Sequence, residues 1–140
     1  MNHLLRDHRD RALEWLSSIA MATWAMILAL PGDTIATPNF QEFLAQGLSE
    51  DILAWLFGAV GSFRLTVLII NGKWPKTPFL RIMGAASGFV MWSQVAGLFG
   101  VGFWFYGTAG TGFAIYSILA LAEVFSIAWA AWDARYYQRS

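Results

Sequence analysis

Four apolar stretches, each close to the length of a membrane-spanning helix, set the strongest constraint on how this chain can fold. They run over residues 12–30, 51–70, 79–103 and 113–132. A helix needs about 20 predominantly apolar residues to cross the hydrocarbon core of a bilayer. Hydrophobic residues make up 57% of the chain and charged residues 13%, whereas ordinary globular chains have about 45–50% and about 25%. The sequence therefore predicts an all-α, integral membrane four-helix bundle.

We expect a single membrane domain over residues 1–140, with polar tails at 1–11 and 133–140. A soluble four-helix bundle is the competing interpretation, but it would need polar residues at every third or fourth position of each helix. The last three stretches have few such residues. The first stretch also fits a cleaved signal peptide, because arginines precede it. Trp24 within the stretch and Pro31 at the expected cleavage position favour a retained span.

Lysine and arginine fall on alternate sides of the predicted spans. Of the nine basic residues, all except Arg64 lie in the N-terminal tail, in or beside the second connection, or in the C-terminal tail. Basic residues near span ends stay on the cytoplasmic side. The pattern therefore predicts a multi-pass protein of the bacterial inner membrane with both termini in the cytoplasm. Tryptophans near the span ends are typical of an aromatic belt: Trp15, Trp74, Trp104 and Trp132.

The first connection, residues 31–49, is expected to lie outside the cytoplasm and to contain a short helix in the membrane interface. Thr37-Pro38 resembles an N-cap followed by proline at the first helical position. Four apolar side chains would then share one face of that helix: Phe40, Phe43, Leu44 and Leu48. An ordinary polar loop is the alternative.

Two charged residues lie inside predicted spans, Arg64 in the second and Glu123 in the fourth. Charged residues at membrane depth usually face other protein or a wet cavity, and they are functional candidates. At about 1.5 Å per residue, Arg64 lies roughly 9 Å and Glu123 roughly 14 Å from the cytoplasmic span ends. By the same count Gln94 lies about one turn above Glu123, and Tyr116 shares a helix face with Glu123. We therefore expect an intramembrane polar cluster of Arg64, Gln94, Glu123 and Tyr116.

Three interpretations of this cluster stay open. Arg64 and Glu123 form a structural ion pair, or the two residues serve a conducting or transport function, or Arg64 independently snorkels to the headgroups. The substitution Glu123→Gln separates the first two. It should impair folding if the pair is structural, and it should abolish ion flux without loss of the fold if the pair conducts.

Small residues form two faces that permit close helix packing. Gly84 and Gly88 make a GxxxG pattern in the third span, and Gly58 and Gly61 share a face of the second. We expect these faces to pack spans two and three within one chain. Contact between two chains is the alternative.

The sequence contains few of the residues that catalysis or metal binding requires. It has no cysteine, and its two histidines, His3 and His8, lie in the N-terminal tail. This excludes thiolate metal sites, cysteine nucleophiles and a bis-histidine haem inside the membrane. Nucleotide-binding loops, zinc-hydrolase motifs and nucleophile elbows are absent, and the basic residues form no nucleic-acid patch. We therefore expect no catalytic residue, no metal and no cofactor, and we do not expect an enzyme.

Residues 61–85, GSFRLTVLIINGKWPKTPFLRIMGA, are similar to a pattern of small phage- and prophage-encoded membrane proteins. In that pattern an arginine-bearing span leads into an N-G-x-W turn, then T-P-x-x-R and a Gly-Ala span. The matching positions are Arg64, Asn71, Gly72, Trp74, Thr77, Pro78, Arg81, Gly84 and Ala85. The resemblance covers under a fifth of the chain. It implies a phage setting, in which small multi-span proteins act as holins, holin accessories or superinfection-exclusion factors.

Three functions follow as expectations. The first is a phage-type membrane effector, holin-like or superinfection-exclusion-like. The alternatives are an accessory or assembly subunit of a larger membrane complex, and a small channel or transporter that uses Arg64 and Glu123. The expected partners are the lipid bilayer and either another copy of the chain or a different membrane protein, but not nucleic acid.

Overall fold

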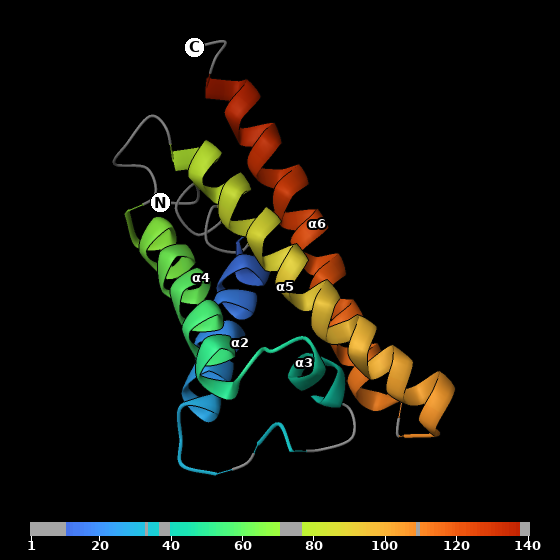
Figure 1. Ribbon diagram of the computed structural model, residues 1–140. Helices are drawn as coiled ribbons and strands as arrows, with labels where there is room; N and C mark the ends of the chain where they lie inside the picture. Colours follow the sequence, from blue (N-terminus) through green and yellow to red (C-terminus); the bar gives the residue numbers. More distant parts are fainter. Residues whose placement is uncertain (1–10, 33, 37–39, 71–76, 109, 138–140) are drawn as a thin grey trace.

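The computed structural model describes residues 11–32, 34–36, 40–70, 77–108 and 110–137. Over these residues the protein is all-α (Figure 1). The helices are α2 (Ala12–Leu28), α3 (Gln41–Ala45), α4 (Glu50–Ile70), α5 (Thr77–Tyr106) and α6 (Thr111–Tyr137).

Local chemistry accounts for where α4 begins and where α5 ends. The Ser49 hydroxyl accepts a hydrogen bond from the Ile52 amide at 3.3 Å, as an N-cap side chain does. Acidic residues in the first turn, Glu50 and Asp51, interact favourably with the positive end of the helix dipole. Gly107 follows α5 with a φ of 66°, and the Thr108 amide donates to the Gly102 carbonyl at 3.2 Å. Glycine in the left-handed conformation is the common way in which a helix ends.

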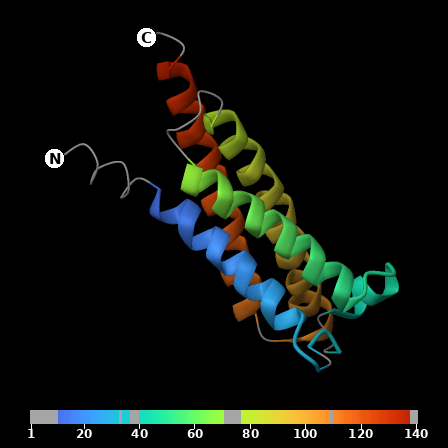
Figure 2. The same ribbon diagram turned by 90° about the vertical axis from the view of Figure 1, so that its left-hand side faces the viewer.

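The four long helices form a bundle made of two closely packed pairs. α2 packs mainly against α4, and α5 packs mainly against α6. Figures 1 and 2 show the two pairs side by side, with α2 beginning at the same end of the bundle at which α6 finishes. Around the bundle the neighbours are α2–α4, α4–α5, α5–α6 and α6–α2. Consequently α2 and α5 are diagonal partners, and so are α4 and α6.

Aromatic rings fill the centre of the bundle between the two pairs. Trp92 of α5 is fully buried and Phe57 of α4 is 1% exposed. Trp24 of α2 lies 5.0 Å from Phe57 and 6.3 Å from Trp92, between ring centroids. Tyr116 of α6 stacks on Trp92 at 5.8 Å. The pairs are therefore held together by large side chains from every long helix.

In Figure 1 the two pairs diverge at the end of the bundle where α2 finishes, and Figure 2 shows α3 at this end, at the side of the bundle next to the start of α4. Phe40, just before α3, inserts its ring between the two pairs, 5.9 Å from Trp24 and 5.4 Å from Phe99. A short helix in this connection was expected. Its proposed N-cap at Thr37-Pro38 lies outside the described residues, and Phe40 belongs to the core, whereas Leu44 is 46% exposed.

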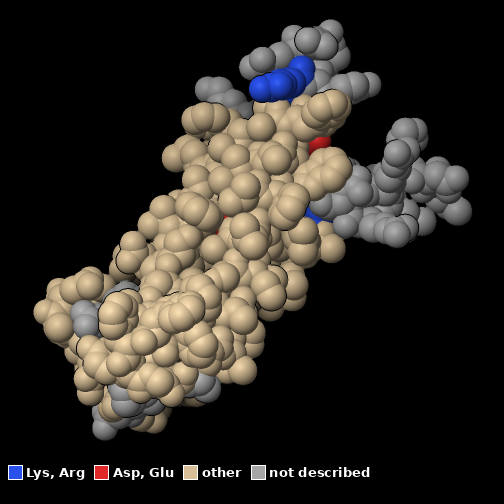
Figure 3. Space-filling model, turned by 90° about the vertical axis from the view of Figure 1, so that its right-hand side faces the viewer, with Lys and Arg blue, Asp and Glu red and all other residues tan. Residues whose placement is uncertain are grey.

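Apolar side chains cover the outside of the long helices. Figure 3 shows a face of the molecule that is almost free of charged side chains between its ends. Among the described residues, three helices are long and apolar enough to cross a membrane: Glu50–Ile70, Pro78–Tyr106 and Thr111–Arg135. α2 is apolar but shorter, at 17 residues, which corresponds to about 26 Å. The described chain is thus a helical bundle with the character of a membrane protein.

The helices extend past two of the predicted spans. α5 reaches Tyr106, where the prediction ended at 103, and α6 continues to Tyr137, where it ended at 132. Residues 133–137, which were assigned to the polar tail, therefore continue α6 as a helix. The extra turn of α6 matters for the site, because it holds Asp133 against the bundle.

Candidate functional site

The buried face of α2 combines polar and apolar side chains. Its buried residues recur at spacings of three and four, which places them on one stripe of a helix: Glu14, Ser17, Ser18, Met21, Ala25 and Leu28. The Ser18 hydroxyl donates to the Glu14 carbonyl at 2.6 Å and so is satisfied within the helix. Glu14 and Ser17 remain free to contact side chains of the other helices.

Arg64 of α4 and Glu123 of α6 form an ion pair in the interior of the bundle. Arg64 is 4% exposed and Glu123 is fully buried. The Ser17 hydroxyl donates to Glu123. It accepts from the Arg64 guanidinium at 3.2 Å and from the Trp92 indole at 3.0 Å. Glu123 Oε2 has no hydrogen-bond partner among the described residues. Arg64 thus points into the bundle.

Two glycines of α5 make room for this pair. A Cβ added at Gly84 would lie 3.0 Å from Arg64 Cγ, and one added at Gly88 would lie 2.5 Å from Glu123 Oε1. Real Cβ atoms essentially never show the distance at Gly88, and the distance at Gly84 is tighter than nine in ten real Cβ contacts. The GxxxG pattern therefore receives the side chains of an ion pair from α4 and α6.

A second ion-paired group lies one to two turns from the first, toward the end where α2 begins. Arg81 of α5 is 5% exposed. It donates through Nε to Glu14 Oε2 at 2.9 Å and pairs with Glu14 through a second nitrogen. It also contacts Asp133 of α6 at 2.6 Å. Two nitrogens of the Arg81 guanidinium thus contact the two carboxylate oxygens of Glu14. This bidentate geometry favours arginine over lysine.

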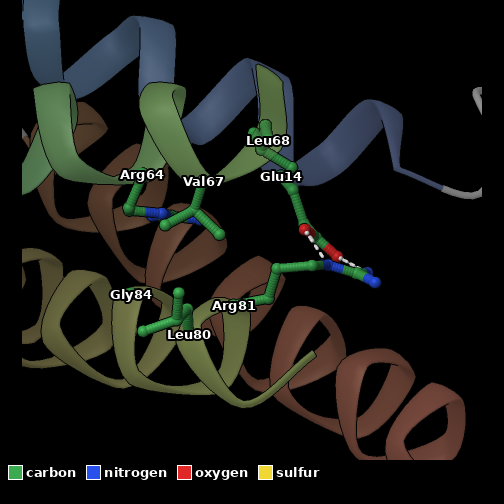
Figure 4. Close-up of a pocket in the computed structure, with 7 residues that line it drawn as sticks. All are labelled: Glu14, Arg64, Val67, Leu68, Leu80, Arg81 and Gly84. Carbon is green, nitrogen blue, oxygen red and sulfur yellow. Dashed lines mark hydrogen bonds and ion pairs between the residues drawn. The ribbon is translucent and has the colours of Figure 1, made fainter. Parts of the chain in front are cut away.

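A small space separates the two ion pairs. Figure 4 shows Arg81 and Glu14 reaching toward each other from opposite helices, with Arg64 on the other side of Val67. The space has a volume of about 10 Å³, which is about the size of one water molecule. In this conformation it is too narrow for an ion that keeps its hydration shell.

Both ion pairs join diagonal helices, and their polarities are opposite. Glu14 of α2 pairs with Arg81 of α5, and Arg64 of α4 pairs with Glu123 of α6. Each helix pair therefore presents one carboxylate and one guanidinium to the other pair. Rotating one pair relative to the other would bring like charges together, so the arrangement specifies how the two pairs dock.

Of the four residues predicted to form the polar cluster, the structure brings Arg64 and Glu123 into contact. Tyr116 touches them only indirectly, because it stacks on Trp92, whose indole donates to Ser17. Gln94 lies outside the cluster and is exposed. The expectation for Gln94 was therefore wrong. That expectation considered only the depth of Gln94 along the helix. With a rotation of 100° per residue, Gln94 points away from Trp92, the residue of α5 that faces the centre of the bundle.

The glycines of α4 also have a different neighbour from the one expected. A Cβ at Gly61 would lie 3.0 Å from the Ala22 backbone nitrogen, and one at Gly58 would lie 3.5 Å from Ala25 Cβ. Both neighbours belong to α2. The small face of α4 thus packs on the first helix, whereas the small face of α5 receives Arg64 of α4.

The sequence prediction missed Glu14, Ser17, Arg81, Trp92 and Asp133. Helical spacing could have found some of them. Asp133 continues the stripe of Glu123, Ser126 and Ala130 at intervals of three and four, and Arg81 lies one turn before Gly84 on the same face. Arg81 was interpreted only as a basic residue that marks the cytoplasmic side, because it lies near the end of a predicted span.

A larger space of about 190 Å³ lies beyond the aromatic core, near α3. It is mainly apolar, and its hydroxyl-bearing residues are Thr34 and Tyr116. The lining residues are Trp24, Ile27, Leu28, Thr34, Phe40, Phe99 and Tyr116. Tyr116 and Trp24 contact Trp92, so the aromatic core separates this space from the two buried ion pairs, which are called the polar centre below.

Fold and site together define an α-helical bundle with three helices long enough to cross a membrane and with ion pairs in its interior. Among the described residues, no group of three or more His, Cys, Asp or Glu could hold a metal ion. Comparison of the chain with protein-family models, with curated proteins and with solved structures finds no match.

Proposed function

We propose that the chain is a four-span protein of the bacterial inner membrane. The apolar exterior of its long helices supports this, because such surfaces need lipid or protein to cover them. Tryptophans exposed near both ends of the bundle would sit at the two membrane interfaces: Trp55, Trp104, Trp129 and Trp132. α2 would be the shortest span, at the lower limit of the usual range of about 17–25 residues.

Both termini are proposed to be cytoplasmic, because the basic residues gather at that end of the spans. The chain has no cysteine, so single cysteines can report the topology. Gln46 and Arg135 are both exposed, at opposite ends of the bundle. In cells with a permeabilised outer membrane, an impermeant maleimide should label Gln46→Cys at once and Arg135→Cys only after lysis. The reverse labelling would contradict this orientation.

Within the membrane we propose a phage-type membrane effector, holin-like or superinfection-exclusion-like. The observation that carries the proposal is that the phage-like segment contributes the buried arginines of the polar centre. Of the matching positions with described side chains, Arg64, Pro78, Arg81, Gly84 and Ala85 are all buried. The shared pattern is thus the α4–α5 segment that positions both guanidinium groups.

Expression in a bacterial host tests this proposal. The chain alone should collapse the membrane potential, measured with a potential-sensitive dye, or reduce plating of challenge phages. A matched control is the double variant Arg64→Met/Glu123→Leu, which removes both charges together and so leaves neither buried without a partner. An effector that uses the centre only for folding should keep its activity in this variant. No phenotype, together with a stoichiometric membrane partner on purification, would instead favour an accessory subunit.

A small channel or transporter is the second candidate, and one observation favours it. Glu123 is fully buried, yet its Oε2 atom has no hydrogen-bond partner among the described residues. A free carboxylate oxygen inside a bundle is a site at which a proton or a small cation can bind. In liposomes, a transporter of this kind should show ion flux that is lost in the folded double variant. Equal flux from the double variant would exclude it.

A further inference from the structure

The outward face of α5 carries a polar side chain that finds no partner among the described residues. Gln94 is exposed in the middle of an apolar helix, and its amide has no hydrogen bond within the described residues. The neighbouring Ser87 differs, because its hydroxyl donates to the Met83 carbonyl at 3.0 Å. Lipid chains offer neither donors nor acceptors. An amide without a hydrogen bond at this depth in a membrane therefore requires a partner outside the chain.

Gln94 lies in a regular stripe of outward residues on α5. The intervals alternate between four and three residues, which gives a narrow seam of the coiled-coil kind. The seam lies on the side of α5 opposite Trp92, and its members are mostly small or flexible. They are Met83, Ser87, Val90, Gln94 and Gly97, all exposed, and Val101, which is half-buried.

Gly97 is a second, independent sign that another helix approaches this face. A Cβ added there would meet nothing within 4 Å, whereas one added at Gly84 or Gly88 would collide with side chains of the same chain. Glycine weakens a helix interior relative to alanine, and within the chain nothing requires it at position 97. Close approach of a second backbone gives the reason.

We propose that this seam of α5 binds the same seam of a second copy of the chain, with the two Gln94 amides hydrogen-bonded to each other across a two-fold axis. An amide has both donors and an acceptor, so it is complementary to itself. A two-fold interface brings the same patch of both copies together. The alternating three and four spacing favours the shallow left-handed crossing common in membrane bundles. The inference rests on the proposed membrane insertion.

Cysteine cross-linking in native membranes tests it, because the chain has no cysteine of its own. Val90→Cys lies in the seam, and Val90 is 55% exposed. Ile118→Cys on α6 is the control, since Ile118 is 64% exposed and lies at a similar level, five residues from Glu123 on a helix antiparallel to α5. Oxidation should give a dimer from Val90→Cys and little or none from Ile118→Cys.

Second substitutions in the Val90→Cys variant identify which seam residues cause the dimer to form. Gln94→Leu should lower the dimer yield at limiting protein-to-lipid ratio by roughly tenfold, the effect expected for a hydrogen bond between helices in a bilayer. Gln94→Asn should retain it, and Gly97→Ile should lower it. A yield unchanged by Gln94→Leu, equal yields from Val90→Cys and Ile118→Cys, or a cross-linked product containing a different protein would overturn the proposal.

The membrane fraction is measured in the same experiment. Protein that resists carbonate extraction but does not cross-link would refute self-association and leave the proposed membrane location intact. Protein recovered in the supernatant would refute the membrane location, and the seam with it.

Discussion

Arg64 and Glu123 meet in the interior of the bundle from diagonal helices, with exposures of 4% and 0%. A buried pair of this kind gains little net free energy, because desolvation of both charges offsets their attraction. Its stronger effect appears when one partner is lost. The remaining charge then stays in a site built for two, between Gly88 and Ser17, with no way to reach water.

Glu123→Gln should therefore destabilise the protein by about 3–5 kcal/mol, the usual cost of breaking a buried pair on one side. The double variant Arg64→Met/Glu123→Leu should cost much less, since neither charge is left alone. Reversible unfolding in mixed detergent micelles gives both free energies. A single variant no less stable than the double variant would show that the pair does not couple the helices.

Glu14→Gln and Asp133→Asn should differ, although both remove a carboxylate that contacts Arg81. The Glu14 side chain is 7% exposed and the Asp133 side chain is 35% exposed. Solvent weakens the contact between Arg81 and Asp133, so Asp133→Asn should lower the free energy of unfolding by about 1 kcal/mol or less. Glu14→Gln should lower the free energy of unfolding several times more, because it leaves the buried Arg81 guanidinium without the carboxylate that balances its charge. Equal losses in the free energy of unfolding would contradict this order.

Gly88→Ala and Gly97→Ala form a matched pair on one helix. A Cβ at Gly88 would lie 2.8 Å from Glu123 Cδ, and one at Gly97 would meet nothing within 4 Å. Overpacking at Gly88 should cost about 1–3 kcal/mol. Gly97→Ala should leave the monomer unchanged or stabilise it by up to about 1 kcal/mol. Unfolding at high detergent-to-protein ratio, where copies are separated, measures both; tolerance of alanine at position 88 would argue against the described packing.

Trp92→Phe should lower the free energy of unfolding because it removes the indole N–H that donates to Ser17 at 3.0 Å. The lost hydrogen bond accounts for about 0.5–1.5 kcal/mol, and the smaller ring adds a packing loss. Trp129 is 51% exposed, and Trp129→Phe should change stability by no more than about 0.5 kcal/mol. Thermal unfolding of the two variants side by side provides the comparison, and similar midpoints would count against the role of Trp92.

How much could be predicted from the sequence depends on the kind of information each residue carries. Apolar length located the long helices, and the rise per residue brought Arg64 and Glu123 to similar depths, where the structure places them in contact. Depth does not determine the face, so Gln94 was assigned to the interior although it points outward. Arg81 was interpreted as a charge beside a turn because it lies close to the start of α5, and Asp133 was missed because residue 133 was assigned to a tail. The contacts of Glu14 depend on how α2 meets α5, which no pattern within one helix determines.

The crossing of both ion pairs between α2–α4 and α5–α6 has a consequence for synthesis. The ribosome completes α2 and α4 before α5 exists, so Glu14 and Arg64 have neither of their ionic partners when the first half of the chain is made. Arg81 arrives next, at the start of α5, and Glu123 follows in α6. Charge neutralisation in the interior therefore waits for α6, and a chain truncated before α6 would be left with an unmatched Arg64 that quality-control proteases could recognise.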